Sequence, residues 1–258
     1  MSYEVQLAER FLRERTFEIF DHFDHYVTAD MWTTTASNSG TVAVQEAVNG
    51  ILKVNPSSNG GNSQAVNDET YVESTHELFK LATDKPMFFA ARVRPVGNTI
   101  ANQALMVGLI DAVAANAIVD TTGVPKTSTD AVLFYKSNTD ATWYAMAEAN
   151  STEMSGITDG VDTNETATNN QWQNLTIRTV PKSSTLTEVH FGFALENSSD
   201  GSYSIREVGQ TLVGKQLVCQ TITHTSAAEM AVVLGVKAGV ANDSQYLDVD
   251  WIYAAQRR

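Results

Sequence analysis

Short runs in which apolar and polar residues alternate dominate the chain after residue 40. Successive side chains of a β-strand point to opposite faces of its sheet, so this period of two predicts strands with one buried face. In one clear example, Val189, Phe191, Phe193 and Leu195 share one face and His190 lies on the other. Turn-forming Gly, Ser, Thr, Asn and Asp residues separate the runs. The predicted strands span residues 41–46, 49–54, 71–81, 87–94, 104–110, 131–136, 142–149, 171–179, 187–195, 216–224, 230–237 and 246–254.

The run at 246–254 shows the alternation especially well. Every second residue from Leu247 to Tyr253 belongs to its apolar face, and the residues between them, including Asp248, Asp250 and Ile252, belong to the other. A strand with this pattern is expected to cover the core with Trp251 and to present Asp248 and Asp250 on its second side.

Residues 1–20 break this pattern and predict a short helix. The segment from Glu4 to Arg15 consists largely of good helix formers and contains no Gly or Pro. Leu7 and Phe11 are four residues apart and therefore share one helical face. A helix of about 12 residues is marginal in water, so we expect it to pack on the body or on a neighbouring subunit. The predicted organisation is a partly helical N-terminal arm, residues 1–20, followed by a β-sandwich jelly-roll domain, residues 21–258.

Polar connectors lie between the predicted strands. Residues 55–63 are rich in Asn, Ser and Gly, and residues 150–170 form a long polar stretch. Oxygen-bearing side chains at 159–164 could hold calcium, although the later Gly and the terminal Glu of an EF-hand loop are misplaced. No repeat of about 20–50 residues indicates a propeller or solenoid. About a dozen strands in one chain predict an all-β fold, an antiparallel two-sheet β-sandwich of the jelly-roll type.

Charge narrows the range of partners. The 258 residues carry a formal net charge of −13, with a sequence pI of about 4.7. Such acidity argues against binding nucleic acid or an anionic membrane through a broad basic patch. No apolar run reaches the roughly 18 residues of a membrane span. The N-terminus also lacks the apolar region of a signal peptide, which predicts synthesis in the cytoplasm without a signal.

Two features that suggest metal or thiol chemistry have simpler explanations. In the segment Asp21–His25, His22 and His25 are three apart, but the sequence places no third and fourth metal ligand beside them. We interpret this segment as the junction between arm and body, with Phe23 buried and its polar neighbours solvated. The single cysteine, Cys219, excludes an intrachain disulfide, and its strand-like surroundings predict a buried structural thiol.

Two acids and two arginines form a second candidate group. Asp248 and Asp250 share one face of a predicted strand, and a pair of carboxylates is what glycoside hydrolysis requires. Arg92 and Arg94 share the polar face of the strand at 87–94. We expect the arginines to form structural ion pairs with acids on neighbouring strands, Asp248 and Asp250 among them, rather than an anion site.

Aromatic residues offer a further possibility, because an exposed aromatic ring can stack on a sugar. In a sandwich of this size we expect such side chains to belong mainly to the core. The residues concerned are Trp143, Tyr144, Trp172 and Trp251. The chain contains no glycine-rich phosphate loop, no Gly-x-Ser-x-Gly and no His-Glu-x-x-His. The sequence therefore assigns no catalytic, cofactor-binding or metal-binding residue, and it predicts a protein that is not an enzyme and uses no cofactor.

Several strand sequences together resemble concanavalin A-like jelly rolls over about residues 21–258. The opening Phe23-Asp24-His25-Tyr26 with Trp32 resembles their first strand, and Leu247–Tyr253 resembles their last. Between them, Phe88–Val93, Met106–Asp111, Ala131–Lys136 and Thr142–Ala145 resemble their central strands. Concanavalin-like glucanases carry Glu-x-Asp-x-x-Glu on such a strand, and this motif is missing here. Without it, the set is most similar to virion proteins of tailed bacteriophages, several of which are head decoration (cement) proteins.

This resemblance implies a structural role on a virion. A decoration protein binds the outside of the capsid, braces the major capsid protein and often forms a homo-oligomer such as a trimer, with residues 1–20 as the expected contact. Its location would be the capsid exterior. The alternative is a lectin-like module on a phage tail or fibre that recognises host glycans, and an enzyme acting on polysaccharide is a third possibility. The fold hosts all three, so it does not choose among them.

Overall fold

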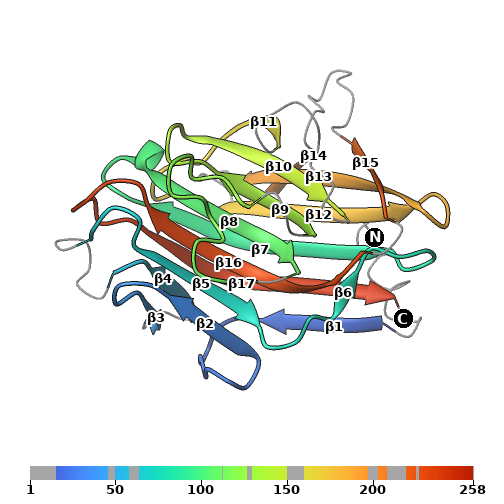
Figure 1. Ribbon diagram of the computed structural model, residues 1–258, viewed down its shortest axis with the longest axis horizontal. Helices are drawn as coiled ribbons and strands as arrows, with labels where there is room; N and C mark the ends of the chain where they lie inside the picture. The colour runs from blue at the N-terminus through green and yellow to red at the C-terminus, as the bar shows by residue number, and fades with distance from the viewer. Residues whose placement is uncertain are drawn as a thin grey trace.

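Two antiparallel β-sheets, stacked one behind the other in Figure 1, make up the protein. This computed structural model describes residues 16–45, 50–57, 64–111, 113–126, 130–149, 160–196, 203–207, 219–224 and 227–257. The only regular helix in these residues is a short 3₁₀ turn, η1 (Ile100–Asn102). None of the described helical structure is long and apolar enough to cross a membrane.

Sheet A contains nine strands. Seven follow one another in the order β14 (Tyr203–Glu207), β13 (Leu186–Glu196), β12 (Gln173–Pro181), β7 (Met87–Val96), β17 (Tyr246–Arg257), β4 (Ile51–Asn55) and β3 (Thr41–Gln45). In addition, β1 (Thr16–Asp21) pairs with β17, and β15 (Cys219–Thr223) pairs with β13.

Sheet B contains eight strands. Its main path is β11 (Val161–Thr166), β10 (Thr142–Glu148), β9 (Ala131–Lys136), β8 (Gln103–Ile110), β16 (Glu229–Ala238), β5 (Glu69–Ser74) and β2 (Trp32–Ala36). The short β6 (Phe79–Lys80) pairs with β16.

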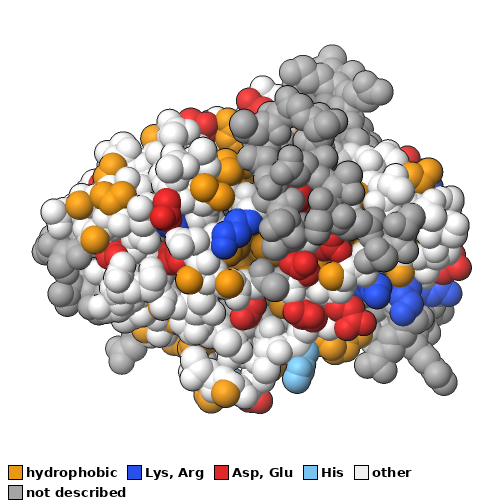
Figure 2. Space-filling model, viewed as in Figure 1, with side chains coloured by type: hydrophobic (Ala, Val, Ile, Leu, Met, Phe, Trp, Pro, Cys, Tyr) orange, Lys and Arg blue, Asp and Glu red, His pale blue; other side chains and the backbone are white. Residues whose placement is uncertain are grey.

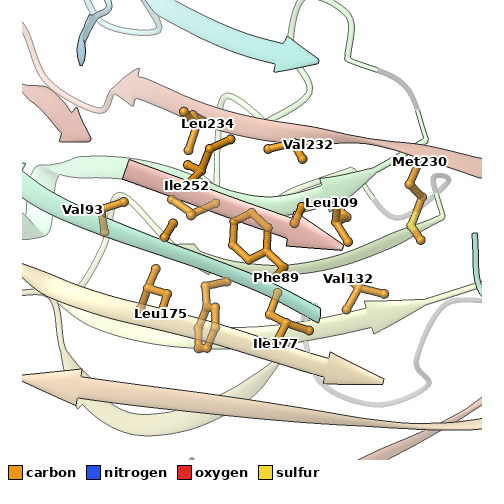
Figure 3. Close-up of a cluster of buried hydrophobic side chains, with 14 of the residues drawn as sticks. Phe89, Val93, Leu109, Val132, Leu175, Ile177, Met230, Val232, Leu234 and Ile252 are labelled. Atoms are coloured by element: carbon orange, nitrogen blue, oxygen red, sulfur yellow. The ribbon is translucent and has the colours of Figure 1, made fainter. Parts of the chain in front are cut away.

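The main core lies between the two sheets. Figure 3 shows side chains of β7, β12 and β17 meeting those of β8, β9 and β16. Phe134 packs edge-on against both Trp143 and Phe191, with ring centroids 6.5 and 5.2 Å apart. Burial of each large apolar side chain contributes about 1.5–3 kcal/mol, so this layer supplies most of the driving force for folding.

A second apolar layer covers the outer face of sheet B. Alternate residues of the central strands, such as Met106, Leu133 and Val233, point away from the main core and are fully buried. The connection between β8 and β9 folds over them, and its residues Ala117 and Ile118 complete the layer. Burial on both faces explains why β8 and β9 are apolar at every position except Gln103, at the start of β8, and Lys136, at the end of β9.

The strand predictions are largely confirmed, and the exceptions lie at sheet edges. The predicted strand at 71–81 divides into β5 and β6. Strands β2, β11 and β14 were not predicted, because edge strands such as Thr-rich β2 and polar β11 bury little and show weak apolar alternation. The proposed calcium loop at 159–164 overlaps β11, so most of it is a strand and not a loop.

The prediction that residues 16–20 belong to an arm outside the sandwich is wrong. These residues belong to β1, which pairs along its length with the C-terminal half of β17. Ile19 is buried, and Phe17 packs edge-on against Phe79 at a centroid distance of 5.8 Å. The β-branched and aromatic composition of Thr16–Phe20 favours a strand once a partner edge exists. The helix predicted from Glu4 to Arg15 lies outside the described part of the chain, which begins at Thr16.

A β-bulge also overturns the predicted faces of the last strand. The register with β7 shifts between Val249 and Trp251, so that Asp250 is an extra residue on β17. The alternation reverses after it: Ile252 is buried in the core, whereas Trp251 is half-buried on the outer side. One inserted residue flips every side chain that follows it, which a strict period of two does not foresee.

Candidate functional site

A pocket of about 340 Å³ opens at one end of the outer face of sheet B. This volume is at the small end of the range of about 300–1,000 Å³ found for ligand pockets. Its lining combines two tyrosines and one carboxylate with several hydroxyl groups, from Thr121, Thr122, Val124, Tyr135, Ser137, Thr139, Asp140 and Tyr144.

Two tyrosines from adjacent strands form one wall. Tyr135 on β9 and Tyr144 on β10 are directly opposite each other in the register, and their rings stack with centroids 5.3 Å apart. Gly160 lies behind this wall, where an added Cβ would come 2.6 Å from the ring of Tyr135. Its φ of +147° is also unfavourable for other residues, so glycine is required here on both counts.

A small hairpin from the β8–β9 connection forms the opposite wall. Backbone hydrogen bonds Val119 N to Val124 O (2.8 Å) and Lys126 N to Ala117 O (2.9 Å) close the hairpin, with Thr121 and Thr122 exposed at its tip. Gly123 has a φ of +66°, and a Cβ there would come 2.5 Å from the backbone nitrogen of Asn138. The hairpin tip therefore packs directly against the turn that forms the third wall.

The third wall is the turn between β9 and β10, built around Asp140. The carboxylate of Asp140 accepts hydrogen bonds from the Tyr144 hydroxyl (2.9 Å) and from Thr142 N (2.8 Å). Beneath the turn, the fully buried Lys136 Nζ donates to the carbonyls of Ser137 and Asp140, both at 2.7 Å. Lys136 thus holds the two ends of the turn together from below.

The environment changes the acidity of two of these groups. Burial, together with the hydrogen bond to Asp140, raises the pKa of Tyr144 to about 12, so its hydroxyl remains a donor at neutral pH. Burial lowers the pKa of the Lys136 ammonium to about 7, and the attraction of the Asp140 carboxylate limits this fall. The Asp140 carboxylate is thus held by two hydrogen-bond donors, the Tyr144 hydroxyl and Thr142 N.

The arrangement is suited to a polyhydroxylated ligand. A sugar ring offers an apolar C–H face for an aromatic wall and a rim of hydroxyls that both donate and accept hydrogen bonds. Tyr144, backed by the buried ring of Tyr135, supplies the aromatic surface, Asp140 accepts, and the hydroxyls of Thr121 and Thr122 can do either. Among the described lining residues Asp140 is the single carboxylate, whereas glycoside hydrolysis uses a pair of carboxyl groups.

The acids and arginines singled out in the sequence lie elsewhere, on the outer face of sheet A. Asp250 pairs with Arg92, and Asp248 accepts two hydrogen bonds from Arg94, the shorter at 2.6 Å. Both carboxylates are thus committed to structural ion pairs, as predicted. The guanidinium groups of Arg92 and Arg94 each lie 4.6 Å from the ring centroid of Trp172.

The prediction that the four aromatic residues belong to the core is correct only for Trp143. Its ring is fully buried, and its Nε1 donates to Gln173 Oε1 at 3.0 Å. Tyr144, Trp172 and Trp251 are half-buried instead, at the surfaces of the two sheets. For Trp251 the cause is the bulge, and for Trp172 it is a position just before β12 begins.

The segment Asp21–His25 begins at the last residue of β1. Phe23 is fully buried, as predicted, and the carboxylate of Asp21 accepts from Trp32 Nε1 and Phe23 N, both at 2.7 Å. Within the described residues, no three His, Cys, Asp or Glu side chains gather closely enough to hold a metal ion. Cys219 begins β15, but its side chain lies outside the described part.

Sequence reasoning missed Asp140, Lys136 and the hairpin. The signal that was available is the turn sequence Ser137-Asn138-Thr139-Asp140 between two strong strands. A charged residue at the end of the apolar run Ala131–Lys136 is a second hint that this strand ends at a polar structure. Neither signal indicates which distant segment completes the pocket.

No family model and no curated protein sequence matches the chain. Solved structures match it over most of its length. Peanut lectin covers 94% of this chain and 97% of its own, with a TM-score of 0.54 and 10% identity. An endo-1,3-beta-glucanase from Streptomyces sioyaensis covers 93% and 96%, with a TM-score of 0.54 and 15% identity. The exoplasmic/lumenal domain of VIP36, in its Ca²⁺/Man3GlcNAc-bound form, covers 92% and 87%, with a TM-score of 0.53 and 10% identity.

At these identities the likeness bears on architecture and not on activity. It agrees with a sandwich of two antiparallel sheets. The chain therefore has the concanavalin A-like jelly-roll fold of lectins, a fold that also carries a glucanase.

Proposed function

We propose that the protein is a lectin-like carbohydrate-binding module and that the pocket beside Tyr144 and Asp140 is its glycan site. The observation that carries this proposal is the combination, in one pocket, of a stacked tyrosine pair, a fixed carboxylate and exposed hydroxyls. Structures of the same fold that include lectins support it, and a VIP36 domain bound to Man3GlcNAc shows that this fold can hold a neutral glycan.

Binding without hydrolysis is part of the proposal. The single carboxylate among the lining residues and the commitment of Asp248 and Asp250 to arginines support it. The glucanase of the same fold makes the hydrolytic alternative worth testing directly. Incubation with a 1,3-β-glucan should release no reducing ends, and release that depends on Asp140 would contradict a purely binding role.

The direct test is an array of neutral oligosaccharides that includes Man3GlcNAc and 1,3-β-glucan fragments. We expect the wild-type protein to bind at least one class and Asp140→Asn to weaken that binding by about tenfold, because a charged acceptor contributes roughly 1.5–3 kcal/mol. Tyr253→Phe is a control outside the pocket and should bind like wild type, because Tyr253 lies on the outer face of sheet A. Equal binding by wild type and Asp140→Asn would show that the glycan site lies outside this pocket.

The capsid decoration role implied by the sequence resemblance stays a second, weaker proposal. No virion protein is among the structures compared above, and the described residues carry no feature that favours it. The predicted contact segment also changes, because residues 16–20 are a strand of sheet A. A cryo-EM map of the particle that carries this protein, with or without sandwich density on its outer shell, would decide the question.

A further inference from the structure

The ammonium group of Lys237 is surrounded by four oxygen atoms. Its Nζ lies 2.9 Å from Glu69 Oε2, 3.0 Å from Asn116 Oδ1, 2.8 Å from the carbonyl oxygen of Ile118 and 2.5 Å from Asp120 Oδ1. The Lys237 side chain is only 3% exposed. Two carboxylates, one amide oxygen and one backbone carbonyl therefore converge on one buried cation.

This group fastens the pocket hairpin to the sheet. Lys237 and Glu69 belong to the adjacent strands β16 and β5, whereas the other three oxygens come from the short segment 116–120. Glu69 also accepts from Asn116 N at 2.6 Å, and Ile118 N donates to Tyr71 Oη at 3.0 Å. The residue after Asp120 is Thr121, the first residue of the pocket wall. The position of that wall thus depends on the Lys237 contacts.

The four oxygens around Lys237 are of the types that calcium binds, and they supply part of the roughly six to eight oxygen ligands that it takes. Calcium in proteins takes carboxylate, amide and backbone carbonyl oxygens, at about 2.3–2.6 Å. Here the same ligand types hold an ammonium group, which carries one positive charge against two carboxylates.

We propose that Lys237 is an internal cation that holds the pocket hairpin in place of a divalent metal ion. It is a positioning residue, because it acts on the pocket through Asp120 and the hairpin. The fixed Lys237 then lets the pocket assemble without added calcium. That the pocket binds a glycan rests on the proposed function, whereas the role of Lys237 in holding the hairpin does not.

Removal of the side chain should turn the site into a true metal site. Lys237→Ala leaves Glu69 and Asp120 facing each other without a counterion. Ca²⁺ would neutralise both carboxylates, and the oxygens need to close in by only a few tenths of an ångström to reach it. Lys237→Met is the matched variant, because its apolar stem removes the charge but still fills the space.

The test is hydrogen exchange of the full chain, read by mass spectrometry over residues 113–126, in EDTA and in CaCl₂. Backbone amides of Asn116, Ile118 and Val119 are hydrogen-bonded in this segment and report on its opening. We expect wild-type exchange to be the same in both buffers. Lys237→Ala should exchange about tenfold faster in EDTA and return towards the wild-type rate in CaCl₂. Lys237→Met should be fast in both, and the exposed Lys182→Ala should match wild type.

Three results would overturn the proposal. They are slower wild-type exchange in CaCl₂, wild-type exchange rates in Lys237→Ala, and fast exchange of Lys237→Ala that CaCl₂ does not slow. A Lys237→Ala chain that folds only in CaCl₂ would support it. None of these readouts uses a sugar, so a failed glycan array would leave the cation role standing and a failed exchange test would leave the glycan site standing.

Discussion

Two buried lysines, Lys136 and Lys237, differ in how their charges are compensated. Transfer of an ammonium group from water is costly unless oxygen acceptors surround it. Lys237 has two carboxylates among its partners. Lys136 has backbone carbonyls instead, with the Asp140 carboxylate acting only through its charge. Burial therefore lowers the pKa of Lys136 to about 7.

The lowered pKa of Lys136 predicts a pH-dependent contribution to stability. Between pH 7 and 10.5 the unfolded chain keeps this proton and the folded chain has lost it, so the unfolded state binds more protons and stability rises with pH. The free energy of unfolding of wild type minus that of Lys136→Met should therefore increase across this window, by at most about 1.4 kcal/mol per pH unit. Urea unfolding at several pH values measures it. The control is Lys182→Met, for which the difference in free energy of unfolding from wild type should not change with pH. A difference for Lys136→Met that is equally independent of pH would contradict a lowered pKa of Lys136.

At the scale of elements, the sequence predicts the strands that contribute most residues to the core. The central strands β7, β8, β9 and β16 have strong apolar patterns because they are buried on at least one whole face. The bulge at Asp250 is invisible in the pattern, since the insertion of one residue is defined only by pairing with β7. Likewise β1 is a strand because β17 offers it an edge, which local helix propensity does not reveal.

The reassignment of β1 predicts where the N-terminus can be cut. A protein that begins at Thr16 keeps the whole of β1 and serves as the reference. One that begins at His22 loses buried Ile19, the Phe17–Phe79 contact and the Trp32–Asp21 hydrogen bond. We expect a cost of about 3 kcal/mol, which for a chain of this size lowers Tm by roughly 6–12 °C. Thermal unfolding followed by circular dichroism gives both values, and equal Tm for the two truncated proteins would show that β1 contributes nothing to stability.

At the scale of the whole molecule, the candidate site depends on segments that are distant in the sequence. Its walls come from the tyrosines of β9 and β10, the hairpin at 117–126 and the turn at 137–140. The hairpin is fastened by Glu69 and Lys237, which are 168 residues apart in the sequence. The alternation that predicts two sheets does not reveal which loop covers which face. The second apolar layer on sheet B is visible in the sequence only as strands whose interior positions are all apolar. The fold class was therefore accessible from the sequence, whereas Tyr144 is the one residue of the pocket that the sequence singled out.

The overall charge of the molecule then bears on which glycans the pocket can hold. The chain has a net charge of −13, acidic side chains are spread over the face shown in Figure 2, and Asp140 places a carboxylate in the pocket itself. A ligand that carries sulfate or carboxylate groups is therefore repelled both on approach and within the site. This field weakens with salt, because the Debye length falls from about 30 Å at 0.01 M to about 8 Å at 0.15 M ionic strength.

We accordingly expect the protein to bind neutral oligosaccharides at least about threefold more tightly than their sulfated or sialylated counterparts at low salt. Raised ionic strength should narrow this preference, because it screens the long-range repulsion from the acidic surface and leaves the contacts inside the pocket largely unchanged. An array of matched neutral and charged glycans, read at low and at physiological salt, measures both effects. Tighter binding of the sulfated glycans, weakening as salt is added, would instead indicate a basic recognition surface. The ligand site would then have to be sought away from Asp140, beside the arginines on the outer face of sheet A.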